Sequence, residues 1–210
     1  MHVANTYRNY RRGSDGNSMH KCTWTGLTFR TALLVILASA VGAADQDPVA
    51  VGKDAVQARK AAILSLTGFL QNGEAFRTKP DDAATAATLL GELRANEAVP
   101  ILLEHAAFEP HPSYHPEMIS NFPCALALVR IGGAAVPGLV KLMAVDDGYA
   151  AATGGVQMLV MIDGPEMACA RLRLALASEK DPERHERLAR ALEGAEMFRR
   201  NSHPPTVPPQ

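Results

Sequence analysis

The chain has 210 residues, enough for one domain or two small ones, and 47% of them are hydrophobic and 20% charged, as in a globular protein. Only 5% are aromatic and alanine is abundant, which favours closely packed helices over a β-sandwich. The formal net charge is −1, and without residues 1–44 it becomes −5, with 16 basic and 21 acidic residues; this acidity argues against nucleic acid and anionic membranes as partners.

Residues 1–44 have the composition of an N-terminal extension followed by a signal peptide. Lys21 and Arg30 precede the apolar run TALLVILASAVGAA, whose small terminal residues fit a cleavage site. Met19 opens a more conventional signal sequence than Met1, so we expect translation to start there. The sequence therefore predicts an exported protein, periplasmic or secreted, that leaves the membrane after cleavage. The alternative is an uncleaved anchor.

The next predicted element is a long amphipathic helix over residues 52–76. Apolar residues at helical spacing predict its buried face. They are Ile63, Leu64, Leu66 and Leu70. We expect this helix to cover the N-terminal end of the domain, which we place at residues 45–200.

Residues 81–110 predict a helical hairpin. The first apolar stripe is Leu89, Leu90 and Leu93, and the second is Val99, Ile101, Leu102 and Leu103. Pro100 falls in the first turn of the second helix, where its missing N–H removes no helical hydrogen bond. A turn of only a few residues joins the two helices.

Residues 122–145 repeat this pattern when Pro137 is placed over Pro100, 37 residues earlier. The stripes are Leu128, Val129 and Ile131, then Val136, Leu139, Val140 and Leu142. Between them, Gly132 and Gly133 predict a helix C-cap and a turn. Pro137 again predicts a helix start.

A third, weaker copy covers residues 155–177. Its stripes are Leu159, Val160 and Ile162, then Met167, Leu172, Leu174 and Leu176, with Gly164-Pro165 at the turn. Repeated hairpins at intervals of about 30 to 40 residues are typical of an α-solenoid, in which each pair buries its apolar face on the next. The sequence predicts an all-α fold with about three to four such hairpins. The alternative is an ordinary bundle in which similar hairpins coincide.

Two further segments complete the domain. Residues 181–198 predict a capping helix, with Asp181 as N-cap and Pro182 as its first residue. Leu188, Leu192 and Met197 recur there at helical spacing beside a charged face. The last segment, residues 201–210, is proline-rich, and we expect it to be disordered.

The hairpins resemble HEAT-like repeats of the phycobilisome-lyase type, whose units read as Leu-Gly-x-Leu, a turn, then Ala-Val-Pro-x-Leu. LLGELRANEAVPILLEHA matches closely, ALVRIGGAAVPGLVKLM matches well, and LVMIDGPEMACARL matches in outline. The resemblance covers residues 81–178 and implies a short right-handed α-solenoid. It implies a binding scaffold more than an activity, because only a minority of such repeats act as lyases or hydroxylases.

One irregular loop could carry chemistry. His105, His111 and His115 lie in residues 104–117 together with Glu104, Glu109 and Glu117, and such N/O ligands suit zinc or non-haem iron. However, the loop is broken by prolines, and its spacing matches no helical ligand pair. We therefore predict no cofactor, and keep a HEAT-like enzyme or metalloprotein as the alternative.

The remaining candidates concern cysteines and cations. An oxidising compartment permits a disulfide between Cys124 and Cys169, but both lie in apolar helical contexts where a cysteine behaves as a small core residue, which is the reading we favour. The groove of a solenoid would expose a partly basic stripe for another protein or a peptide. Its candidate residues are Arg94, Arg130, Lys141, Arg171 and Arg173. We therefore predict a non-catalytic protein–protein interaction scaffold.

Overall fold

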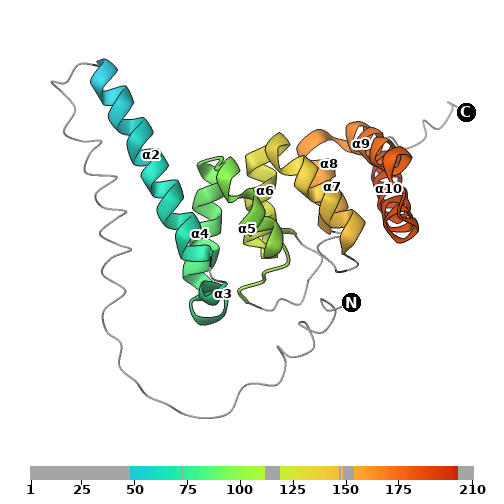
Figure 1. The fold of residues 1–210 in the computed structure, drawn as a ribbon, viewed down its shortest axis with the longest axis horizontal. Helices are drawn as coiled ribbons and strands as arrows, with labels where there is room; N and C mark the ends of the chain where they lie inside the picture. Colours follow the sequence, from blue (N-terminus) through green and yellow to red (C-terminus); the bar gives the residue numbers. More distant parts are fainter. Residues whose placement is uncertain (1–47, 72, 112–118, 147, 149–153, 203–210) are drawn as a thin grey trace, which may run out of the picture. The chain divides into compact units, whose positions relative to one another are not determined.

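The computed structural model describes residues 48–71, 73–111, 119–146, 148 and 154–202 (Figure 1). The predicted signal peptide, His115 and the proline-rich residues 203–210 lie outside them. Contacts between residues divide the chain into two units, Met1–Gly52 and Lys53–Gln210. The packing described below is that of the second unit.

Every regular element in the described residues is helical, which confirms the all-α prediction. In chain order the elements are α2 Pro48–Leu70, α3 Glu74–Thr78, α4 Pro80–Glu92, η2 Asn96–Ala98, α5 Val99–Glu104, η3 Ile119–Asn121, α6 Pro123–Ile131, η4 Gly132–Ala135, α7 Val136–Val145, α8 Gly155–Asp163, α9 Pro165–Ser178 and α10 Pro182–Ser202, where η marks a short 3-10 helix. The helix predicted over residues 52–76 is wrong at its end, because α2 stops at Leu70 and α3 begins at Glu74.

Prolines mark the starts of these helices, as their lack of an N–H predicts. Pro100 and Pro137 are the second residues of α5 and α7, each following a short 3-10 turn. Pro165 and Pro182 are the first residues of α9 and α10. Asp181 accepts a hydrogen bond from the backbone N–H of Arg184 at 3.0 Å, which confirms it as the N-cap of α10.

Helices from successive hairpins pack beside one another. α4 packs along α6, and α6 packs along α8, so the first helices of the three pairs are neighbours in turn. Beside them, α5 packs along α7. The end of the chain departs from a simple repeat, because α9 packs on α8 and α10, and α10 packs on α7 and α8 as well.

Two of these helix contacts place a glycine close to a residue of the neighbouring helix. A Cβ placed on Gly91 of α4 would lie 2.8 Å from Cα of Ala127 in α6, so the two helices meet where neither has a large side chain. A Cβ placed on Gly138 of α7 would lie 2.3 Å from Cδ1 of Leu103 in α5. Both distances are shorter than real Cβ contacts. Gly91 is required by packing because it faces a backbone atom, whereas at Gly138 the end of the Leu103 side chain would have to shift.

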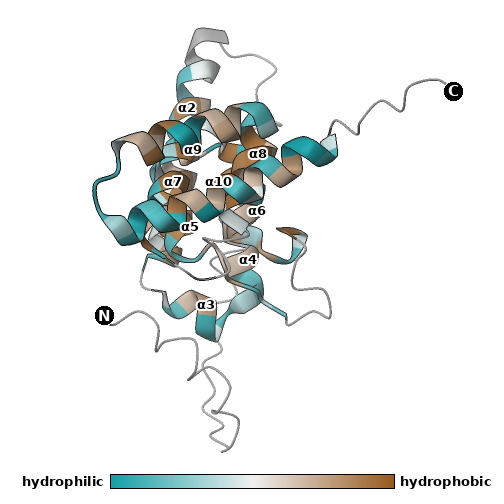
Figure 2. Ribbon diagram, turned by 90° about the vertical axis from the view of Figure 1, so that its right-hand side faces the viewer, coloured by the Kyte–Doolittle hydropathy of each residue, from teal (hydrophilic) through white to brown (hydrophobic). Residues whose placement is uncertain are grey.

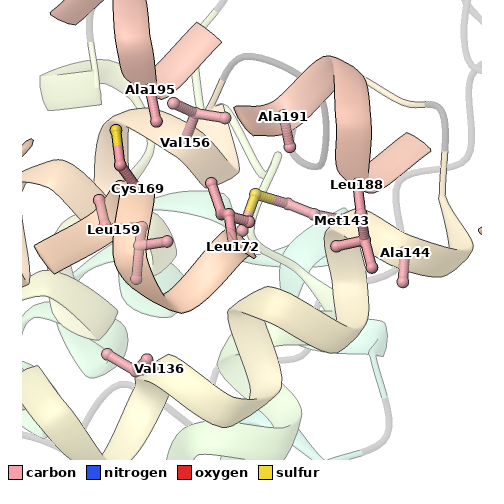
Figure 3. Packing of buried hydrophobic residues seen from close by; sticks show 11 residues of the cluster. Val136, Met143, Ala144, Val156, Leu159, Cys169, Leu172, Leu188, Ala191 and Ala195 are labelled. Atoms are coloured by element: carbon pink, nitrogen blue, oxygen red, sulfur yellow. The ribbon is translucent and has the colours of Figure 1, made fainter. Parts of the chain in front are cut away.

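One hydrophobic cluster forms where α7, α8, α9 and α10 converge (Figure 3). It contains Val136, Met143, Ala144, Val156, Leu159, Ala168, Cys169, Leu172, Leu188, Ala191 and Ala195. In Figure 2, α10 is largely hydrophilic with a few hydrophobic residues, as expected for a helix with one face in the core. Arg187 of α10 also donates a hydrogen bond to the carbonyl oxygen of Ala144 at the end of α7, at 3.4 Å.

Most predicted core residues are buried or half-buried, but four are exposed. In α2, Ile63, Leu66 and Leu70 are buried, whereas Leu64 is 63% exposed. Met167 and Leu174 of α9 are 51% and 74% exposed, and Met197 of α10 is 53% exposed. These four assignments were wrong because helical spacing does not say which of two apolar faces meets the core.

One stretch, Pro123–Val145, is long and apolar enough to cross a membrane by length and composition alone. The same test is passed by core helices of proteins without a membrane span. Here the stretch comprises α6, η4 and α7, with buried residues on both α helices. Its composition is therefore accounted for by core packing.

A residue with positive φ follows the first helix of each of the three hairpins. It is a glycine after α6 and α8, and an arginine after α4. Gly132 ends α6 with φ 81°, and Gly164 ends α8 with φ 80°. After α4 the residue with positive φ is Arg94, at 47°. A side chain in this region costs about 1 kcal/mol or more, whereas glycine adopts it freely.

We expect Gly132→Ala to lower the free energy of unfolding by about 1 kcal/mol, because alanine resists the positive φ. No atom lies within 4 Å of a Cβ placed on Gly132, so a steric clash would not contribute. Arg94→Gly should be neutral or stabilising for the converse reason. Urea denaturation of both variants measures the two changes in the free energy of unfolding. Equal losses of stability would contradict the conclusion that positive φ favours glycine at these turns.

Candidate functional site

The two described histidines of the predicted metal loop have separate environments. The ring of His105, which follows α5, stacks on Phe76 of α3 with centroids 3.8 Å apart and planes inclined by 24°. Phe108 meets the same Phe76 ring edge-on at 4.8 Å. His105 is therefore part of an aromatic cluster that joins α3 to the end of α5.

His111 instead pairs with an acidic residue that the sequence analysis did not include. Its Nε2 atom lies 2.8 Å from Oδ1 of Asp81, in the first turn of α4. Both side chains are about three-quarters exposed, at 74% and 78%, so this ion pair contributes little stability. No local signal could have identified Asp81, because it lies 30 residues from His111.

The structure does not assemble the predicted metal ligands in the residues it describes. Within these residues, no group of three or more His, Cys, Asp or Glu side chains is placed to hold an ion. His105 and His111 contact different helices, α3 and α4. The metal hypothesis for His105, His111 and His115 therefore has no described geometry behind it.

Burial lowers the pKa of His105 below its ordinary value of 6.5, while the charge of Glu104 opposes this shift. His105 therefore takes up a proton at higher pH in the unfolded chain than in the folded chain. We expect the free energy of unfolding to fall as pH drops from about 6.5 towards the lower pKa of the folded state. Above that range His105 is neutral in both states and contributes no pH dependence.

The measurement is denaturant unfolding of the wild type and of His105→Phe between pH 5 and 8. Phenylalanine keeps an aromatic ring beside Phe76 but cannot titrate. The stability of the variant relative to the wild type should rise as pH falls. A difference independent of pH would show that His105 titrates equally in the folded and unfolded chain.

Both cysteines of the described helices are buried thiols. Cys124 of α6 is 0% exposed and Cys169 of α9 is 1% exposed, and both are free. Desolvation raises the pKa of Cys124 to about 12, so its thiolate, the reactive form, is not populated at neutral pH. The two side chains act as small core residues.

Three of the five predicted partner-binding cations form ion pairs between helices. Arg130 of α6 lies 2.9 Å from Glu92 of α4. Arg173 of α9 lies 2.7 Å from Glu196 of α10. Arg171 pairs with Asp163 at the end of α8. These side chains therefore link neighbouring helices while remaining 39% to 54% exposed, so each pair contributes little stability.

The other two predicted cations are exposed, and neither forms an ion pair with another described residue. Arg94 lies in the turn after α4, and Lys141 lies on α7. Arg130 and Lys141 thus come from both helices of one hairpin rather than from a single set of helices. A continuous basic stripe that includes all five cations remains a prediction.

A small apolar cavity lies where the ends of α5, η3, α6 and α8 meet. Its lining is Ala106, Ile119, Phe122, Ala125, Gly154, Gln157 and Met158. Gln157 is the one polar side chain in this lining. The cavity supplies apolar contact area without an arrangement of charged or nucleophilic groups.

The chain was compared with family models, with curated proteins and with solved structures, and none of them matches it.

Proposed function

We propose that this chain is an exported, non-catalytic protein–protein interaction scaffold, built as a short right-handed α-solenoid of HEAT-like hairpins. The observation that carries the proposal is the order of helix contacts. α4, α6 and α8 pack in succession, and α5 packs along α7 beside them. Stacked hairpins of this kind create extended surfaces that bind other proteins.

The surface chemistry supports a protein or peptide partner. Arg94 and Lys141 offer positive charge that other described side chains do not neutralise, and the domain without residues 1–44 has a net charge of −5. An acidic segment of a partner would suit these two cations locally, whereas the overall charge disfavours nucleic acid. Arg130, Arg171 and Arg173 would contribute their exposed edges.

Site-specific photo-crosslinking tests the proposal in the organism that makes the protein. A photoreactive residue would be placed at Gly133 or Ala134, both exposed in the turn before the helix that carries Lys141, and at the exposed Gln57 of α2 as a control. We expect a discrete crosslinked protein from the first two positions, lost in the double variant Arg94→Glu and Lys141→Glu. Crosslinking that is unchanged by the double variant would contradict the role of these cations.

The alternative is a HEAT-like enzyme or metalloprotein that uses the loop of His105, His111 and His115. Elemental analysis of the purified full-length protein separates the two proposals. Stoichiometric zinc or iron that is lost in His111→Ala would favour the alternative. Metal content at background level in both proteins would favour the scaffold.

A further inference from the structure

Helix α9 has apolar side chains on two opposite faces. Its inner face, with Ala168, Cys169 and Leu172, is buried against α8 and α10. Its outer face has a stripe of exposed apolar residues, which we call the α9 stripe. They are Met167, Ala170, Leu174 and Ala177. A helix that is apolar on both sides is typical of one covered on both sides.

The α9 stripe is straight and electrically neutral. Its residues are spaced three, four and three apart, so they fall within about 80° of the helix circumference. Arg171, Arg173 and Glu166 flank it, and the two arginines are already paired within the chain, with Asp163 and with Glu196. The stripe therefore offers no free charge to an acidic or basic partner.

Large and small side chains alternate along the stripe, so its order is complementary to its own reverse. When two copies of α9 lie antiparallel around a twofold axis that crosses the outer face at the level of residue 172, Met167 faces Ala177 of the other copy and Ala170 faces Leu174. Each large side chain then meets a small one, which is the complementarity that close helix packing needs.

We propose that this protein forms a twofold symmetric dimer through the α9 stripe, with a second copy of the chain as its occupant. The stripe spans ten residues, a rise of about 15 Å, so two stripes bury less than the roughly 1,200 Å² of a standard stable interface. The dimer is therefore weak and exchanges rapidly. This inference is independent of the proposed scaffold function, since either can hold without the other.

Sedimentation velocity of the full-length protein over a range of concentrations tests the dimer. We expect reversible association, with a dissociation constant of about 10 µM to 1 mM. Leu174→Glu should raise that constant about tenfold or more, because it places a charge in the apolar interface. The matched control is Leu64→Glu on α2. It makes the same substitution at another exposed leucine, which is 63% exposed, against 74% for Leu174.

The control should leave the dissociation constant within about twofold, well under the 1.4 kcal/mol that a tenfold change represents. Circular dichroism would show that both variants keep the helical fold. A wild type that stays monomeric at about 1 mM, a concentration at which even a very weak complex forms, would overturn the proposal. Equal weakening by Leu64→Glu would also overturn it, because association would then not depend on α9.

Cysteine crosslinking tests the antiparallel register. The variants Ala170→Cys and Leu174→Cys would be oxidised alone and as an equal mixture, while the buried Cys124 and Cys169 remain inaccessible. We expect the mixture to form disulfide-linked dimers faster than either variant alone, because residues 170 and 174 face each other across the axis. Equal rates in all three samples would overturn the register and with it the twofold pairing.

Discussion

Replacing Leu172 by alanine should lower the free energy of unfolding by about 3 kcal/mol, whereas Leu174→Ala should change it by less than about 0.5 kcal/mol. The two leucines are two residues apart on α9. Leu172 is 0% exposed and belongs to the cluster of α7, α8, α9 and α10, and Leu174 is 74% exposed. The same substitution therefore leaves a cavity at one position and none at the other.

Urea denaturation of both α9 variants, at a protein concentration low enough to keep them monomeric, gives this comparison. It measures the rotation of α9 about its own axis, which the apolar spacing of the sequence could not determine. Losses of similar size would mean that Leu174 is also buried. That outcome would remove the basis of the α9 stripe.

Gly91→Ala should lower the free energy of unfolding by about 2 kcal/mol, although alanine is ordinarily the better helix former. The added Cβ would lie 2.8 Å from Cα of Ala127, a backbone atom that moves only if α4 and α6 separate. The matched control is Gly68→Ala in α2, where no atom lies within 4 Å of the added Cβ. There we expect a gain of about 0.5 to 1 kcal/mol.

Thermal or urea unfolding of both variants and of the wild type shows whether each substitution raises or lowers the free energy of unfolding. Opposite signs follow only if α4 and α6 approach closely at this point. A stabilising Gly91→Ala would show that the two helices are farther apart, and would contradict the contact between the first two hairpins.

Helix starts and ends were largely predictable because they depend on local chemistry. Pro100 and Pro137 lie in the first turn of their helices, where a backbone N–H has no partner within the helix. Gly132 ends a helix because it accepts a positive φ. These preferences need no information about distant residues. The same holds for Asp181, whose carboxylate caps the helix that follows it.

Which apolar face is buried could not be predicted in the same way. Met167 and Leu174 have the spacing of a core stripe, and so do the inward residues Ala168, Cys169 and Leu172. The choice between the two faces depends on where α8 and α10 pack. Tertiary packing, rather than the periodicity of α9, decided it.

The candidate site was predictable in residue type but not in pairing. Exposed arginines were expected, but the partners of Arg130 and Arg173 are Glu92 and Glu196, on other helices. His111 likewise pairs with a residue 30 positions away. Such pairs arise only when helices pack, so a single sequence identifies the cations and leaves their partners open.

The central claim is that the first helices of successive hairpins, α4, α6 and α8, pack in turn, and that the second helices of the first two hairpins, α5 and α7, pack beside them. Nuclear Overhauser effects test it most directly, with methyl-labelled alanine and leucine and with glycine protons. The account predicts contacts from the Ala127 methyl group to the Gly91 α-protons, and from a Leu103 methyl group to the Gly138 α-protons. Absence of both contacts in the folded protein, with α4 and α5 packed on other helices, would contradict the stacked arrangement.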